Sequence, residues 1–151
     1  MTTLENKIDG IDLRMVKIKL QDLEEGPGWS LEKTDLIEKE YKRFLYLCSL
    51  DCQAIPTKDI DTMWHQHILD TRAYAKDCQE VFGFFLHHFP YLGMRGEEDV
   101  LLLHTLFEKT TSIYNEKFKE SYARCKSGCS SGRCSGAGCI GSCTSNLTLC
   151  T

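Results

Sequence analysis

The chain has 151 residues, of which 42% are hydrophobic and 26% are charged, a balance typical of one soluble domain with a hydrophobic core. Its formal net charge of −4 argues against a nucleic-acid partner, because phosphate binding requires a concentrated basic face. No apolar run approaches the roughly 20 residues of a membrane span, and the first residues lack the apolar stretch of a secretory signal, so we expect a cytoplasmic protein without a membrane partner.

Two amphipathic helices are predicted in the first third of the chain. Leucine and valine side chains recur at helical spacing over residues 13–23, and the breakers at 24–28 end that run. Ser30 is a good N-cap for a second helix. The apolar stripe of this second helix consists of Leu36, Ile37, Tyr41, Phe44, Leu47 and Cys48.

A third helix is predicted after Pro56, with Thr57 as its cap. It is expected to run from about Lys58 into the low eighties, with an irregularity near Asp70, and to end at Gly83. A short aromatic segment, 84–89, follows.

The last predicted helix begins with the acids of 97–99, which suit the positive end of a helix dipole. Its apolar stripe consists of Val100, Leu103, Phe107, Thr110, Tyr114 and Phe118. No alternating strand pattern appears anywhere. The sequence therefore predicts an all-α fold, a bundle of about four to five helices over residues 1–124.

Four of the five histidines lie between residues 65 and 88, a density that points to metal binding. Asp61 and His65 are one helical turn apart and can bind one ion together. His67 is rotated about 200° from His65 on a regular helix, so it cannot reach the same ion unless the helix breaks. A pairing of His67 with Cys78 is disfavoured, because about 16 Å separates positions three turns apart.

His87 and His88 are neighbours in the irregular segment, and either one can face the helix. One arrangement places Asp61, His65 and one of these two around zinc, iron or manganese, with an open coordination position such as a metal catalyst needs. The sequence names no substrate and does not decide whether the protein is an enzyme. The candidate ligands of this ordered site are Asp61, His65, His67, His87 and His88.

The composition changes sharply near residue 124, which divides the chain into a helical domain, 1–124, and a tail, 125–151. The tail is rich in serine and glycine and holds six cysteines: Cys125, Cys129, Cys134, Cys139, Cys143 and Cys150. It has too few apolar residues for a core, so it is expected to be disordered unless metal, disulfides or modification constrain it. No C-x2-C pair of the kind that structural zinc sites use is present.

Three interpretations of the tail remain open. Its thiolates can gather soft ions such as copper(I) or zinc. Alternatively, the tail is a modified cargo, and the helical domain is the module that a modification enzyme recognises. The third interpretation is a reduced tail with no discrete role.

The middle of the chain resembles the glycine-rich domain-containing protein-like family, which has long plant members and short bacterial ones. The pattern is an acid, Trp-His-x-His, Tyr-x-x-Asp-Cys and a glycine. Here it falls on Asp61, Trp64, His65, His67, Tyr74, Asp77, Cys78 and Gly83. The resemblance covers roughly residues 10–118 and implies no established activity. Short bacterial members also carry glycine- and cysteine-rich tails, although the tail here uses more serine and cysteine.

Three functions are therefore consistent with the sequence. The first is a metal-binding helical protein, whose partners are the ion itself and a metal-handling protein. The second is a precursor or carrier protein with a modified tail. The third is a protein-interaction domain whose histidines are structural.

Overall fold

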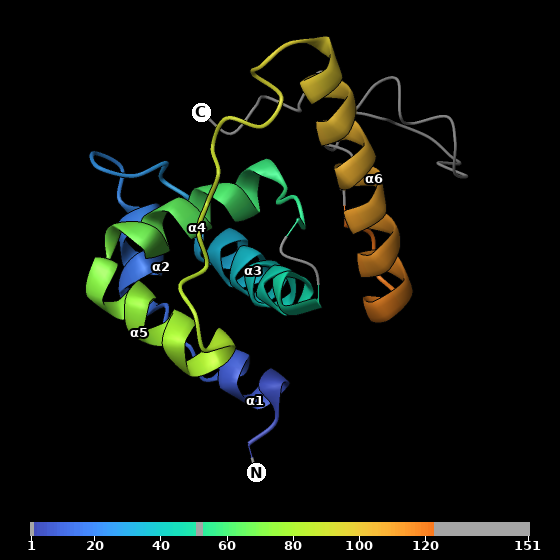
Figure 1. The fold of residues 1–151 in the computed structure, drawn as a ribbon. Coiled ribbons are helices and arrows are strands. Elements are labelled where there is room, and N and C mark those ends of the chain that lie inside the picture. Colours follow the sequence, from blue (N-terminus) through green and yellow to red (C-terminus); the bar gives the residue numbers. More distant parts are fainter. Residues whose placement is uncertain (1, 51–52, 123–151) are drawn as a thin grey trace. The chain divides into compact units, whose positions relative to one another are not determined.

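The computed structural model describes residues 2–50 and 53–122, and within these ranges it is helical without a strand (Figure 1). This confirms the all-α prediction. The helices are α1 (Leu4–Asp9), α2 (Arg14–Gln21), α3 (Leu31–Leu50), α4 (Lys58–Leu69), α5 (Thr71–Phe82) and α6 (Glu97–Phe118). None of these helices combines the length and the hydrophobicity needed to cross a bilayer.

The described helices outnumber the four to five that were predicted, for two local reasons. The short helix α1 has only six residues, too few for a periodic pattern to be visible. The predicted third helix is two helices, because Asp70 leaves helical geometry with a ψ of 73° and its side chain caps α5 by accepting the Ala73 N–H at 3.3 Å. The break lies where the sequence predicted an irregularity.

The chain divides into two compact units, with the division between Phe89 and Pro90. The predicted boundary between residues 124 and 125 lies outside the described residues and stays a prediction. So do the predicted disorder, metal binding or disulfide bonding of the tail.

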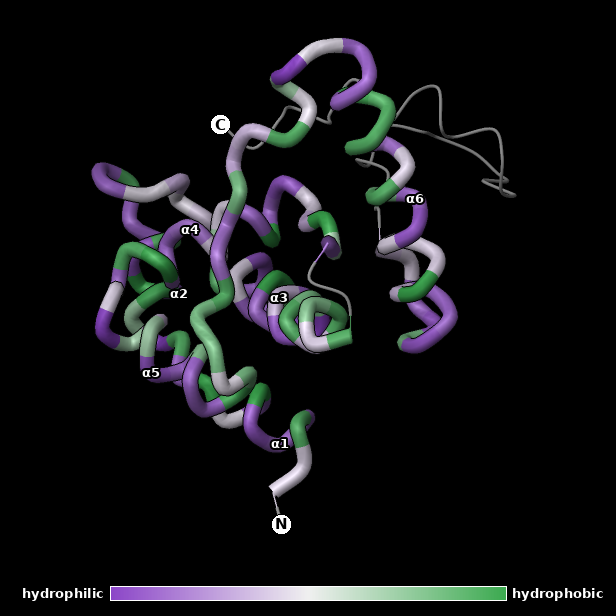
Figure 2. The backbone as a smooth tube through the Cα atoms, viewed as in Figure 1, coloured by the Kyte–Doolittle hydropathy of each residue, from purple (hydrophilic) through white to green (hydrophobic). Residues whose placement is uncertain are grey.

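The first unit is built around α3, which packs against α1, α2 and α4, while α5 packs against α4 and α1. Hydrophilic and hydrophobic residues alternate along these helices (Figure 2), as expected when one face of each is buried. Tyr41 and Phe44 of α3 and Ile60 and Met63 of α4 have no exposed surface. This core sets the rotation of α4, and with it the direction in which its polar residues point.

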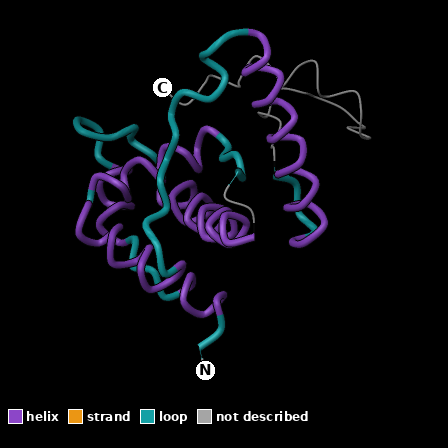
Figure 3. Tube along the Cα trace, in the orientation of Figure 1, coloured by secondary structure: helices purple, strands orange, loops and turns teal. Residues whose placement is uncertain are grey.

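Residues 83–89 leave α5 without forming another helix (Figure 3). Gly83 begins this segment with a φ of 75°, a left-handed conformation that glycine adopts without strain. Leu86 is buried, and the His88 ring lies against α4. The segment therefore brings a histidine back to the helix that carries Asp61 and His65.

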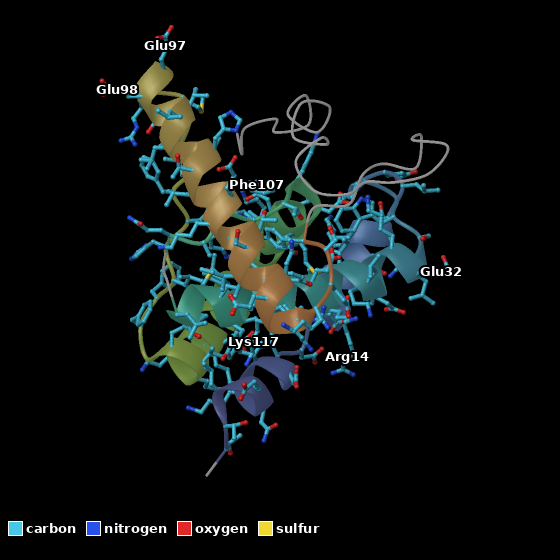
Figure 4. The ribbon with its side chains drawn as sticks, turned by 90° about the vertical axis from the view of Figure 1, so that its right-hand side faces the viewer. Arg14, Glu32, Glu97, Glu98, Phe107 and Lys117 are labelled. Atoms are coloured by element: carbon cyan, nitrogen blue, oxygen red, sulfur yellow. The ribbon has the colours of Figure 1, made fainter. Side chains whose placement is uncertain are left out.

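The second unit contains α6, and Figure 4 shows Glu97 and Glu98 at one end of this helix, Phe107 midway and Lys117 near the other end. This distribution of charge is favourable for the helix dipole. Of the predicted apolar stripe, Leu103, Thr110 and Tyr114 are buried, whereas Val100 is 38% exposed.

Candidate metal centre

Asp61, His65 and His88 bring three potential ligand atoms together, all within 4.8 Å of one another. The Nε2 atom of His88 lies 2.8 Å from Asp61 Oδ1 and 2.8 Å from His65 Nε2. His65 Nε2 is 3.4 Å from Asp61 Oδ2. The structure thus selects His88 over His87 as the histidine that completes the group.

Helix geometry explains two of these positions. Asp61 and His65 are one turn apart on α4, so their side chains project from the same face. His88 comes from the segment after α5, and its imidazole stacks on the indole of Trp64 with 4.3 Å between centroids and 14° between planes. Because Trp64 is three residues after Asp61 on α4, the stack holds His88 beside the α4 pair.

The spacing of the three atoms suits a small divalent ion. Ligands about 2.0–2.1 Å from tetrahedral zinc lie about 3.3 Å from each other. The His65–Asp61 separation of 3.4 Å matches this distance, and the two His88 contacts of 2.8 Å would lengthen by about half an ångström around an ion. Two imidazoles and a carboxylate also match the ligand set of catalytic zinc sites and of non-haem iron sites, which keep further positions open. The Asp61 and His88 side chains are 9% and 10% exposed but that of His65 is 37% exposed, so the group is accessible to solvent from the His65 side.

His67 is placed elsewhere, as its helical angle predicted. Its Nδ1 lies 2.9 Å from the Tyr41 hydroxyl, and its Nε2 lies 3.0 Å from Asp77 Oδ2. Burial lowers the pKa of His67, and the neighbouring Asp77 carboxylate opposes this shift only in part. His67 is therefore neutral at neutral pH and uses both ring nitrogens inside the protein.

His87 and Cys78 also lie outside the group. The His87 side chain is exposed and contacts the Phe85 ring with 4.9 Å between centroids. Cys78 is a buried free thiol, and burial raises its pKa, which disfavours the thiolate that metals bind. The six tail cysteines named as candidate ligands lie outside the described residues.

Two supporting residues were not predicted as part of the site. In the sequence, Trp64 and Tyr74 stand out only as part of the family pattern, yet Trp64 stacks on His88 and donates its indole N–H to Tyr74. The signal available in the sequence was the position of Trp64 three residues after Asp61, which places both on neighbouring parts of one helix face.

Comparison with known proteins agrees with the resemblance drawn from the sequence. The profile of the UCP032817-like family matches residues 13–101. The chain belongs to this family.

Two plant proteins are similar to the same part of the chain. Glycine-rich domain-containing proteins 1 and 2 of Arabidopsis thaliana are each 34% identical to it over 88 residues, or 54% of the chain. These 88 residues amount to 10% and 11% of the two plant proteins, so the chain corresponds to about a tenth of their length. No solved structure matches the chain. The similarity confirms the glycine-rich domain-containing protein-like family. The names of these relatives state no activity, so a function has to be argued from the geometry of the site.

Proposed function

We propose that this family member binds a divalent transition-metal ion through Asp61, His65 and His88. The observation that carries the proposal is the convergence of one carboxylate oxygen and two imidazole nitrogens within 4.8 Å. The ligand set suits zinc, iron or manganese.

The contacts around His88 support an ion better than a set of hydrogen bonds. A neutral imidazole carries a single N–H, and His88 Nε2 has two neighbours at 2.8 Å, Asp61 Oδ1 and His65 Nε2. If this nitrogen carries the proton, it has one N–H for two neighbours, and if it does not, it can accept from His65 but faces the Asp61 carboxylate without a proton between them. A cation placed among the three atoms would instead be coordinated by each of them.

An ion held by three protein ligands has room for a further ligand. Water bound in such a position is acidified by zinc, and oxygen binds at the open positions of comparable iron sites. The half-exposed side of His65 is where such a ligand would enter. No substrate or reaction follows from the triad alone.

The test is metal titration of the full chain with its six tail cysteines replaced by serine, so that only the helical residues contribute. Calorimetry with Zn²⁺ and Mn²⁺ is expected to give one site per chain. Asp61→Asn, His65→Ala and His88→Ala should each weaken binding at least about tenfold. His87→Ala is the matched control, since it removes a neighbouring imidazole that lies outside the triad, and it should leave the affinity unchanged. Equal affinity in the triad variants and in the control would refute the proposal.

The tail carries a second, separate proposal. Its six cysteines suit soft ions such as copper(I) or zinc, which would make residues 125–151 an additional metal-binding arm. Reduced thiols are typical of the cytoplasmic location that we also propose. Composition alone supports this proposal, because the tail lies outside the described residues.

A further inference from the structure

His88 needs support from outside its own segment. Residues 85–89 have no regular secondary structure, so no ladder of backbone hydrogen bonds fixes the direction of the His88 side chain. Two buried aromatic residues, Trp64 of α4 and Tyr74 of α5, contact this segment at separate points.

Trp64 contacts the imidazole directly. Its ring is parallel to that of His88 within 14°, and only 5% of the residue is exposed. The one polar group of this side chain is its Nε1–H, which donates to the Tyr74 hydroxyl at 2.9 Å. The indole is thus fixed at one end while its face carries His88.

Tyr74 extends this contact to the backbone of the segment. Its hydroxyl donates to the Leu86 carbonyl at 2.5 Å, two residues before His88. The ring of Tyr74 also meets Phe85 edge to face, with 5.2 Å between centroids. Burial raises the pKa of Tyr74 far above its usual value, so the hydroxyl keeps its proton and remains a donor.

We propose that Trp64 and Tyr74 are positioning residues. The chain of hydrogen bonds from Trp64 Nε1–H to Tyr74 Oη–H and on to the Leu86 carbonyl, together with the Trp64–His88 stack, holds His88 Nε2 at Asp61 and His65 before an ion arrives. That His88 binds a metal ion rests on the proposed function, whereas the placement of His88 by Trp64 and Tyr74 does not. Preorganisation of this kind raises metal affinity because less freedom of the ligand is lost on binding.

The first test needs no metal. Nuclear magnetic resonance of the metal-free full chain should show nuclear Overhauser contacts between the Trp64 indole and the His88 ring, and their absence would overturn the proposal even if every variant failed to fold. Tyr74→Phe should move the His88 ring signals towards those of free histidine. Tyr41→Phe is the matched control, because it removes another buried tyrosine hydroxyl that binds His67 and not the segment. Unchanged His88 signals in Tyr74→Phe would also overturn the proposal.

The second test is a double-mutant cycle for zinc affinity. Tyr74→Phe should weaken binding about tenfold in the chain that retains His88, within the range typical of residues that orient metal ligands. In the His88→Ala background the same change should have no further effect, because its target is gone. An equal loss in both backgrounds would overturn the proposal. If the protein with its full triad binds no zinc, the proposed function fails, and the resonance measurements still decide whether Trp64 and Tyr74 place His88.

Discussion

His65 and His67 are two residues apart on α4, and their side chains meet different partners. His65 reaches Asp61 and His88, whereas His67 lies between Tyr41 of α3 and Asp77 of α5. The difference follows from the 3.6-residue repeat, which turns the two side chains about 200° apart. His67 therefore joins three helices, and a role in stability is expected for it.

His67→Phe tests this role by keeping a ring of similar size while removing both hydrogen bonds. The buried Tyr41 hydroxyl and the Asp77 carboxylate lose a partner, so the free energy of unfolding should fall by about 2–3 kcal/mol. Urea unfolding measures the change, and His87→Phe, which alters an exposed histidine, should change the free energy of unfolding little. Zinc affinity should stay within about threefold of the starting protein. A tenfold loss of affinity without loss of stability would instead identify His67 as a ligand.

At the scale of elements, local polar contacts decide where helices begin and end. Asp70 separates α4 from α5, and a similar carboxylate organises the start of α6. Asp99 Oδ2 accepts the Gly93 N–H at 2.6 Å and the Arg95 N–H at 3.2 Å, and Asp99 Oδ1 lies 2.7 Å from the Arg95 guanidinium. The turn before α6 is thus tied to its first helical turn.

The Arg95 guanidinium and these backbone donors lower the pKa of Asp99 to about 2. Because this value lies below the usual 3.8, the charged form is favoured on folding, and its stabilising contribution is complete above about pH 4. It should disappear as the pH falls towards 2, since the neutral carboxyl binds these donors more weakly. Carbon-13 titration of the Asp99 carboxyl measures the pKa directly. The stability difference between the starting protein and Asp99→Asn should shrink over the same range, and a difference that persists below pH 2 would contradict this explanation.

At the scale of the whole molecule, the triad and its supports belong to one unit. Asp61, His65, Trp64, Tyr74 and His88 all lie within residues 1–89. Residues 90–124 separate the tail from them in sequence. Metal bound by the triad and metal bound by the tail should therefore be separable.

Replacing all six tail cysteines with serine should leave one zinc per chain, held by the triad. The unaltered chain, kept reduced, should retain more than one, because the thiolates add binding capacity. Elemental analysis after dialysis gives both numbers. One equivalent in both proteins would contradict a metal-binding tail, and none in the serine variant would contradict the triad.

Only part of the triad could be predicted from the sequence. Asp61 and His65 could be paired from their four-residue separation, because a helix has a fixed repeat. The choice between His87 and His88 could not be made, because neighbours in an irregular segment follow no repeat. That choice depends on the stack of His88 on Trp64 and on the contact of Tyr74 with Leu86. Trp64 belongs to α4 and Tyr74 to α5, both outside the irregular segment.

The apolar spacing and the breakers of this chain were sufficient to predict an all-helical protein, its main helices and the irregularity at Asp70, since these depend on contacts within a few residues. Tertiary structure alone determined that His88 returns to α4 and that His67 is enclosed among α3, α4 and α5. Both outcomes depend on contacts between residues 10 to 27 positions apart, whose geometry is set by how the helices pack and not by the local order of the residues.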